Sequence, residues 1–148
     1  MAAGILATIV QIVLWSVLTD ALPTILFRDA RFAAAIVMGR GVLPPPASFD
    51  GGVMLAATLV HFALSIAYGL ILSPLIARLR TAASLLAGGV FGLLLYLVNM
   101  YGFTMVFPWF RDSRDGIAIV AHVTFGLVAA GAYRALLHRR SGRTRPAK

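Results

Sequence analysis

Four polar side chains interrupt apolar stretches of this sequence, and their chemistry is the first thing to explain. Asp20, His61, Asn99 and His122 each fall in a different apolar segment. At ~1.5 Å of rise per helical residue, His61 lies ~16 Å along its helix from Asp50, and the other three lie ~10–12 Å from the ends of theirs. Because an ionisable group inside a bilayer is costly, we expect these four side chains to form one polar layer that faces the interior of a helix bundle.

The two histidines of this layer allow three interpretations. Each imidazole can hydrogen-bond a neighbour and fix helix register, which stabilises a membrane bundle by about 0.6 kcal/mol per contact. His61 and His122 can instead ligate haem iron or another metal ion between two helices. Together with Asp20, they can also form a path for protons or ions. The sequence leaves all three open.

Small residues accompany the histidines. His61 and His122 are each followed at the fourth and eighth positions by a small residue, so each histidine and its small neighbours share one helix face. The third apolar segment carries a Gly-x-x-x-Gly motif, which lets two helices approach closely. These packing candidates are Ser65, Gly69, Gly126, Ala130, Gly88 and Gly92. We expect them at contacts within the bundle or in a dimer.

Other kinds of catalytic machinery are missing from the sequence. It contains no cysteine, which excludes disulfides, thiolate metal sites and cysteine nucleophiles. It also contains no Gly-x-Ser-x-Gly elbow, no phosphate-binding loop and no His-Glu-x-x-His motif. In the loop 111–115 the acids alternate with arginines and are expected to neutralise one another. We therefore do not expect an enzyme.

Composition places the chain in a membrane. Of its 148 residues 60% are hydrophobic and 12% charged, and the mean hydropathy is +0.91. A soluble domain of this size needs about twice that share of charged residues. The net charge of +8 is concentrated, since six of the thirteen basic residues fall in the last fifteen positions. A basic tail after a span favours contact with anionic lipid headgroups, and we expect no nucleic acid partner.

The apolar segments predict an all-α fold, a membrane four-helix bundle in one domain over 1–138, followed by a basic tail over 139–148. Its expected spans are about 3–27, 52–77, 82–107 and 116–137.

The connections between the spans carry their own signals. Residues 28–40 have helical spacing of apolar side chains between charged ends, which predicts an amphipathic helix lying in the membrane interface. Three consecutive prolines make 41–50 a stiff connector. Asp50 and Asp115 directly precede apolar runs and are expected to cap the helices that follow.

Basic residues predict the orientation. Four spans put both chain ends on one side, together with Arg78, Arg80 and the basic tail. The five acidic residues all fall on or near the other side. Since basic loops stay on the cytoplasmic side, we expect both termini in the cytoplasm.

Several stretches of the sequence look familiar. PPPASFD, VHFALSIAYGLILSPLIARL, GGVFGLLLYLVNMYGFTMVFPWF and AHVTFGLVAAGAYRAL resemble a group of small, uncharacterised bacterial membrane proteins often labelled "sodium:proline symporter". The similarity covers about residues 40–137. It implies a four-span protein of the bacterial inner membrane, and it brings no substrate and no functional residue to this sequence.

These observations lead to one expected function and one alternative. We expect a non-enzymatic accessory or interaction subunit of the inner membrane, in contact with lipid and with other membrane subunits or further copies of itself. The alternative is a haem- or metal-binding, or ion- or proton-conducting, protein that uses His61 and His122.

Overall fold

A computed structural model describes residues 1–143 of the chain, with side chains up to Arg139. All regular structure in this range is helical, which confirms the expected all-α class. Short 3-10 turns lie at Arg40–Val42, Phe103–Met105 and Pro108–Ser113. The main helices are α1 (Ala2–Leu18), α2 (Thr24–Met38), α3 (Gly51–Ile76), α4 (Thr81–Leu97) and α5 (Gly116–Arg143). The basic tail predicted over 139–148 lies mostly outside the described side chains.

The expected first span over 3–27 is divided between two helices. α1 ends at Leu18, and the next residue, Thr19, has an extended backbone and turns its hydroxyl onto the carbonyl oxygen of Trp15 at 2.7 Å. Pro23 then stands just before α2. Since proline has no N–H to continue the ladder of α1, the helix stops and a second one starts in a new direction.

Both predicted caps are confirmed. The carboxylate of Asp50 accepts a hydrogen bond from the backbone N–H of Val53 at 3.0 Å, where α3 begins. The carboxylate of Asp115 accepts one from the N–H of Ala118 at 2.7 Å, where α5 begins. Each cap satisfies a backbone donor that the first helical turn leaves without a partner.

α4 changes its winding before it ends. After Leu97 the helix continues as a π-helical segment over Val98–Gly102 and then tightens into a 3-10 turn. Arg114 holds this end, because its guanidinium donates to the carbonyl oxygen of Met100 and to the hydroxyl of Thr104, both at 2.6 Å, and lies 4.3 Å from the centre of the Tyr101 ring. A cation at a helix C-terminus satisfies carbonyl oxygens that have no intrahelical partner.

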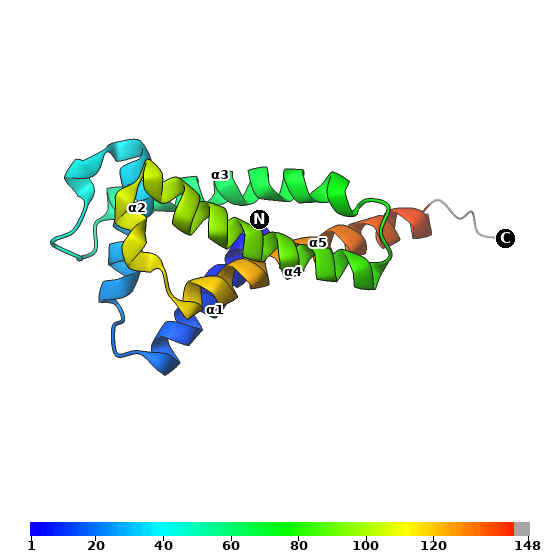
Figure 1. The fold of residues 1–148 in the computed structure, drawn as a ribbon, viewed down its shortest axis with the longest axis horizontal. Coiled ribbons are helices and arrows are strands. Elements are labelled where there is room, and N and C mark those ends of the chain that lie inside the picture. Colours follow the sequence, from blue (N-terminus) through cyan, green and yellow to red (C-terminus); the bar gives the residue numbers. More distant parts are fainter. Residues whose placement is uncertain (144–148) are drawn as a thin grey trace.

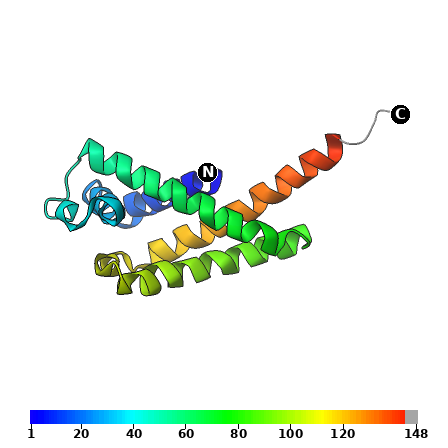
Figure 2. The ribbon, with the colours of Figure 1, turned by 90° about the horizontal axis from the view of Figure 1, so that it is seen from above.

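The helices have two main directions. α3, α4 and α5 run along the length of the molecule, whereas α2 lies across one end of it (Figures 1 and 2). The turn between α3 and α4 and the C-terminal end of α5 lie together at the opposite end (Figure 1). α1 starts about halfway along and packs mainly on α5, where Ala3 and Ala7 meet Phe125.

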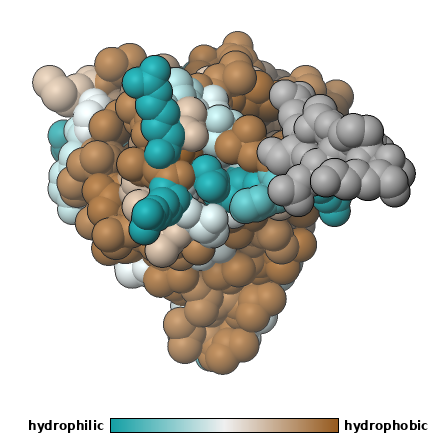
Figure 3. All heavy atoms as spheres, turned by 90° about the vertical axis from the view of Figure 1, so that its right-hand side faces the viewer, coloured by the Kyte–Doolittle hydropathy of each residue, from teal (hydrophilic) through white to brown (hydrophobic). Residues whose placement is uncertain are grey.

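Three helices are long and apolar enough to cross a membrane: Gly51–Ile76, Thr81–Met105 and Gly116–Arg139. α1 is apolar but has only 17 residues. Large apolar side chains on these helices stand outside the core, such as Leu55, Leu70 and Leu86 at 62%, 68% and 72% exposure. Seen from the end that carries the α3–α4 turn, hydrophilic side chains gather near the middle and hydrophobic ones cover the flanks (Figure 3).

Glycines bring α4 and α5 into backbone contact. A Cβ atom on Gly92 would collide with the carbonyl oxygen of His122, and one on Gly88 with that of Gly126. Ala130 is fully buried at the same interface. Gly69 lies on α3 and makes no such contact within the chain: a Cβ at this position would meet no heavy atom within 4 Å.

Polar contacts fix α2 across the end of the longer helices. The guanidinium of Arg31 donates to the carbonyl oxygens of Val42 and Ser48, at 3.1 and 3.2 Å, and so ties the proline-rich connector to α2. The indole N–H of Trp109 donates to the carbonyl oxygen of Phe32 at 3.0 Å. α2 is therefore attached to the segments before α3 and before α5.

Asp29 of α2 joins the same assembly. Its carboxylate pairs with Arg28 at 2.8 Å and accepts from the hydroxyl of Ser113 at 3.2 Å. Burial raises the pKa of the Asp29 carboxyl above 3.8, and the neighbouring Arg28 opposes that effect without cancelling it.

Candidate functional site

A chain of hydrogen bonds joins three helices in the interior. The hydroxyl of Tyr68 on α3 donates to Oδ1 of Asn99 at 2.7 Å. Nδ2 of Asn99, in the π-helical segment, lies 3.2 Å from Nε2 of His122 on α5. Nδ1 of His122 lies 2.7 Å from the carbonyl oxygen of Ala118. We call this series the polar chain.

The donor and the acceptor of each hydrogen bond in the polar chain can be assigned. A carbonyl oxygen only accepts, so Nδ1 of His122 must carry the proton that bonds to Ala118. In a neutral imidazole Nε2 is then an acceptor, which matches a donor from the amide of Asn99. The hydrogen-bond pattern thus assigns the tautomer of His122 and the orientation of the Asn99 amide. Both ring nitrogens of His122 are engaged.

His61 lies beside the polar chain without belonging to it. Its Nε2 is 3.3 Å from the hydroxyl of Thr8 on α1, and the backbone of Gly4 is also within hydrogen-bond reach of the ring. α1 approaches α3 so closely here that a Cβ on Gly4 would lie 2.5 Å from the hydroxyl oxygen of Ser65. A side chain at position 4 would therefore displace the side chains of Ser65 and His61, and Ser65 is buried beneath Gly4.

The polar side chains surround one interior space, which we call the inner cavity. It has a volume of about 160 Å³ and lies between α1, α3, α4 and α5. His61, Asn99, His122 and Ser65 all line it, so the structure brings together three of the four residues of the expected polar layer. A space of this size with several polar partners is suited to hold water molecules.

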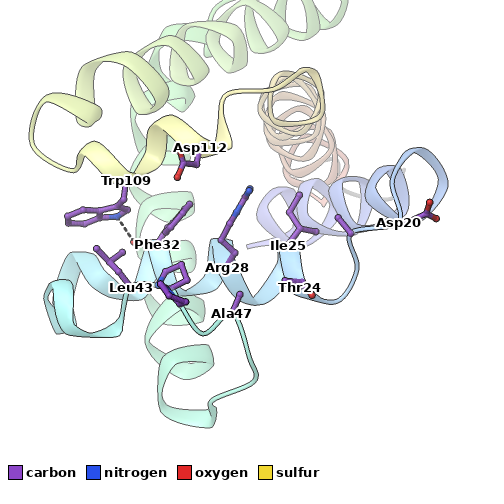
Figure 4. Close-up of a pocket in the computed structure, with 12 residues that line it drawn as sticks. Asp20, Thr24, Ile25, Arg28, Phe32, Leu43, Ala47, Trp109 and Asp112 are labelled. Atoms are coloured by element: carbon purple, nitrogen blue, oxygen red, sulfur yellow. Dashed lines mark hydrogen bonds between the residues drawn. The ribbon is translucent and has the colours of Figure 1, made fainter.

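Asp20 is not part of this layer. It follows the end of α1, is exposed, and lines a separate open hollow of about 640 Å³ beside α2. In Figure 4 it lies at the far edge of that hollow, turned away from Arg28. The depth estimate failed because it assumed that the first helix continues through Pro23.

The site offers little to a metal or to haem. Within residues 1–143 no three His, Cys, Asp or Glu side chains are grouped closely enough to hold a metal ion. To ligate a metal, His122 would have to give up one of its two hydrogen bonds. The inner cavity is also smaller than the ~300–1,000 Å³ of ordinary small-molecule sites.

Two participants were missed from the sequence. Tyr68 was not among the residues singled out above, although it lies seven positions after His61, on the same helix face. Arg114 was expected to be neutralised by neighbouring aspartates, whereas it supports the segment that carries Asn99. The spacing of Tyr68 was a usable signal, but nothing local in the sequence marks the role of Arg114.

Comparison with models of known protein families, with curated proteins and with solved structures finds no match to this chain.

Proposed function

We propose that this is a small multi-pass protein of the bacterial inner membrane, built as a membrane four-helix bundle. α3, α4 and α5 cross the bilayer in this proposal, and α1 packs beside them as the fourth helix. Exposed leucines along the three long helices support it. The resemblance of residues 40–137 to small bacterial membrane proteins is in keeping with this assignment.

α2 lies in the membrane interface in the same proposal. It crosses the end of the long helices (Figures 1 and 2) and buries Phe32, Ala34 and Ala35 on one face. This is the arrangement expected of an amphipathic helix that lies along the membrane surface.

Both chain termini face the cytoplasm in this proposal. The exposed Arg78 and Arg80 lie at the α3–α4 turn, at the same end as the end of α5. α1 runs from the middle of the molecule toward α2, which is the direction of a helix that enters from the cytoplasmic side (Figure 1). The excess of basic residues supports the same orientation.

The role we propose is that of a non-enzymatic accessory or interaction subunit. The observation that carries this role is the polar chain, because Tyr68, Asn99 and His122 satisfy one another. Groups engaged in this way specify how the helices pack and are not free to act on a substrate. The outer apolar surface is then available to lipid, to other membrane subunits or to a second copy.

Purification from the native membrane in mild detergent tests this role. We expect a discrete complex that contains the protein together with other subunits or further copies of itself. The complex should persist in a Tyr68→Phe variant that retains the fold. A monodisperse monomer with no associated protein, recovered across several mild detergents, would contradict the proposal.

Proton handling is the second candidate, and the inner cavity favours it. His61 and His122 both line this space, and among the described residues the side-chain hydrogen bond of His61 is the long 3.3 Å contact with Thr8. If this role is correct, proteoliposomes should show proton flux that His61→Ala abolishes. A Soret absorbance band lost in the same variant would instead indicate haem. A colourless protein that shows no proton flux would support the accessory role instead.

A further inference from the structure

A second cavity adjoins the inner cavity on the side of α2. It has a volume of about 300 Å³ and lies between α2, α3 and the last turns of α4. Apolar side chains form most of its wall, and three of them are phenylalanines: Val60, Leu64, Phe103, Phe107 and Phe110. We call it the phenylalanine cavity. Its volume falls within the ~300–1,000 Å³ typical of small-molecule sites.

The phenylalanine cavity is polar on one side only. His61 and Asn99 line it, and they line the inner cavity as well, so they separate the two spaces. Its lining contains no Asp, Glu, Lys or Arg among the residues that the structure describes. A ligand with a carboxylate or phosphate would lose its hydration here without gaining a counter-charge. The occupant must therefore be uncharged.

Asn99 has unused hydrogen-bonding capacity. Its amide nitrogen carries two hydrogens, of which His122 takes one. The His61 ring is engaged by the hydroxyl of Thr8 and the backbone of Gly4. An oxygen atom on a ligand can accept from the second amide hydrogen of Asn99 without breaking the polar chain.

We propose that the phenylalanine cavity binds an uncharged lipophilic ring that bears a carbonyl oxygen, the chemistry of a membrane quinone headgroup. The ring packs against the phenylalanines, whose rings favour edge-to-face and offset contact with another ring. Its carbonyl oxygen accepts a hydrogen bond from the amide nitrogen of Asn99. The inference rests on the membrane location proposed above and adds a ligand to the interaction role.

Tryptophan fluorescence offers a direct test with decylubiquinone, a short-chain quinone that quenches indole emission. Trp109 adjoins the cavity, because its ring lies 5.4 Å from that of Phe107. In a Trp15→Phe background it is the only tryptophan left. We expect saturable quenching in detergent micelles. Loss of one hydrogen bond in Asn99→Leu should weaken binding about three- to tenfold.

A second variant keeps the test informative if Asn99→Leu does not fold. Val60→Phe fills the cavity from its apolar side, leaves both polar groups in place and should abolish saturable quenching. Thr58→Ala is the matched control on α3, because Thr58 is exposed and bonds only to its own helix. Binding to this control should equal binding to the parent protein.

Two results would overturn the inference. One is quenching that rises linearly with quinone and is the same in Val60→Phe, which indicates partition into the micelle. The other is displacement of the quinone by an equal concentration of dioctanoylglycerol, which indicates an acyl-chain site. Either result would leave the proposed membrane location and subunit role intact. Maleimide labelling of single cysteines tests the location, and co-purification tests the role.

Discussion

Asn99 is the residue on which the interior polar contacts depend. It accepts from Tyr68 and faces His122, so it links α3 to α5 from the π-helical segment. Removing either outer partner leaves one hydrogen bond in place, whereas removing Asn99 takes a partner from two half-buried groups. The energetic consequences should differ accordingly.

The first prediction follows from this asymmetry. We expect Tyr68→Phe to destabilise the protein by about 0.6 kcal/mol, the average for such contacts in membrane bundles. Asn99→Ala should cost about 1–3 kcal/mol, because the Tyr68 hydroxyl and His122 Nε2 both lose their partner. Unfolding followed by circular dichroism in detergent measures both values. Equal losses in the two variants would show that the polar chain is not continuous.

The second prediction concerns Asp29. Its raised pKa means that the folded protein binds a proton more tightly than the unfolded chain does. As pH rises from 3.8 through the folded-state pKa, the wild type therefore loses stability that Asp29→Asn does not lose. The difference in melting temperature, wild type minus variant, should fall over this window and stay constant above it.

Asp112→Asn is the control for that experiment, because Asp112 is exposed. Its difference curve against the wild type should lack the fall. A difference between the wild type and Asp29→Asn that grows with pH would mean that the ion pair with Arg28 outweighs burial.

Three of the four polar residues were grouped correctly from the sequence, and the fourth was not. Distances counted from the helix ends suffice for His61, Asn99 and His122 because their helices continue through those positions. Asp20 lies beyond Leu18, where the hydroxyl of Thr19 and the missing N–H of Pro23 end the helix. Hydrogen bonds between helices, such as that of Tyr68, depend on how each helix is rotated about its axis. Apolar runs in the sequence do not specify that rotation.

At the level of helices, the crossing of α4 and α5 depends on glycine. The two backbones touch at Gly88, Gly92 and Gly126, so the helices approach more closely than any side chain would allow. Since helices in lipid gain no hydrophobic energy by meeting, this close contact supplies much of the attraction between them.

The third prediction uses a pair of glycines as test and control. Gly92→Ala should destabilise the protein by about 1–3 kcal/mol, because its methyl group overlaps the carbonyl oxygen of His122 and forces the helices apart. Gly69→Ala should cause no loss, since its methyl group meets open space. Thermal unfolding of the two variants in the same detergent gives the comparison. Equal stability would indicate that the α4–α5 contact is looser than described.

The helices themselves are easier to predict than their ends. Long apolar runs that follow Asp50 and Asp115 define α3 and α5, because the cap and the run are both local features. The π-helical segment has no such signal. It depends on bonds from Asn99 to other helices and on Arg114, fourteen residues beyond its acceptor at Met100.

On the scale of the whole molecule, the two ends differ in character. Among the described residues, one end has the short α3–α4 turn and the end of α5, and the other has α2, the proline-rich connector and the segment before α5 (Figure 1). The orientation we propose places the smaller end in the cytoplasm.

The fourth prediction tests this orientation, and the cysteine-free sequence makes it simple. Single cysteines at Ser48 and Thr81 mark the two ends, and both positions are exposed. In spheroplasts, a membrane-impermeant maleimide should label Ser48→Cys directly and Thr81→Cys only after permeabilisation. The reverse pattern would invert the orientation, and labelling of both positions without permeabilisation would exclude a span between them.

The π-helical segment also has a consequence for how the chain tolerates change. It holds one residue more than α-helical winding would use over the same length. Deleting Val98 would let regular α-helical winding cover the same length, so the residues on either side would keep their places relative to the glycines of α4. The same deletion within the regular turns of α4 would rotate everything beyond it by about 100°. A single-codon deletion in the π-helical segment should therefore be tolerated far better than one in α4.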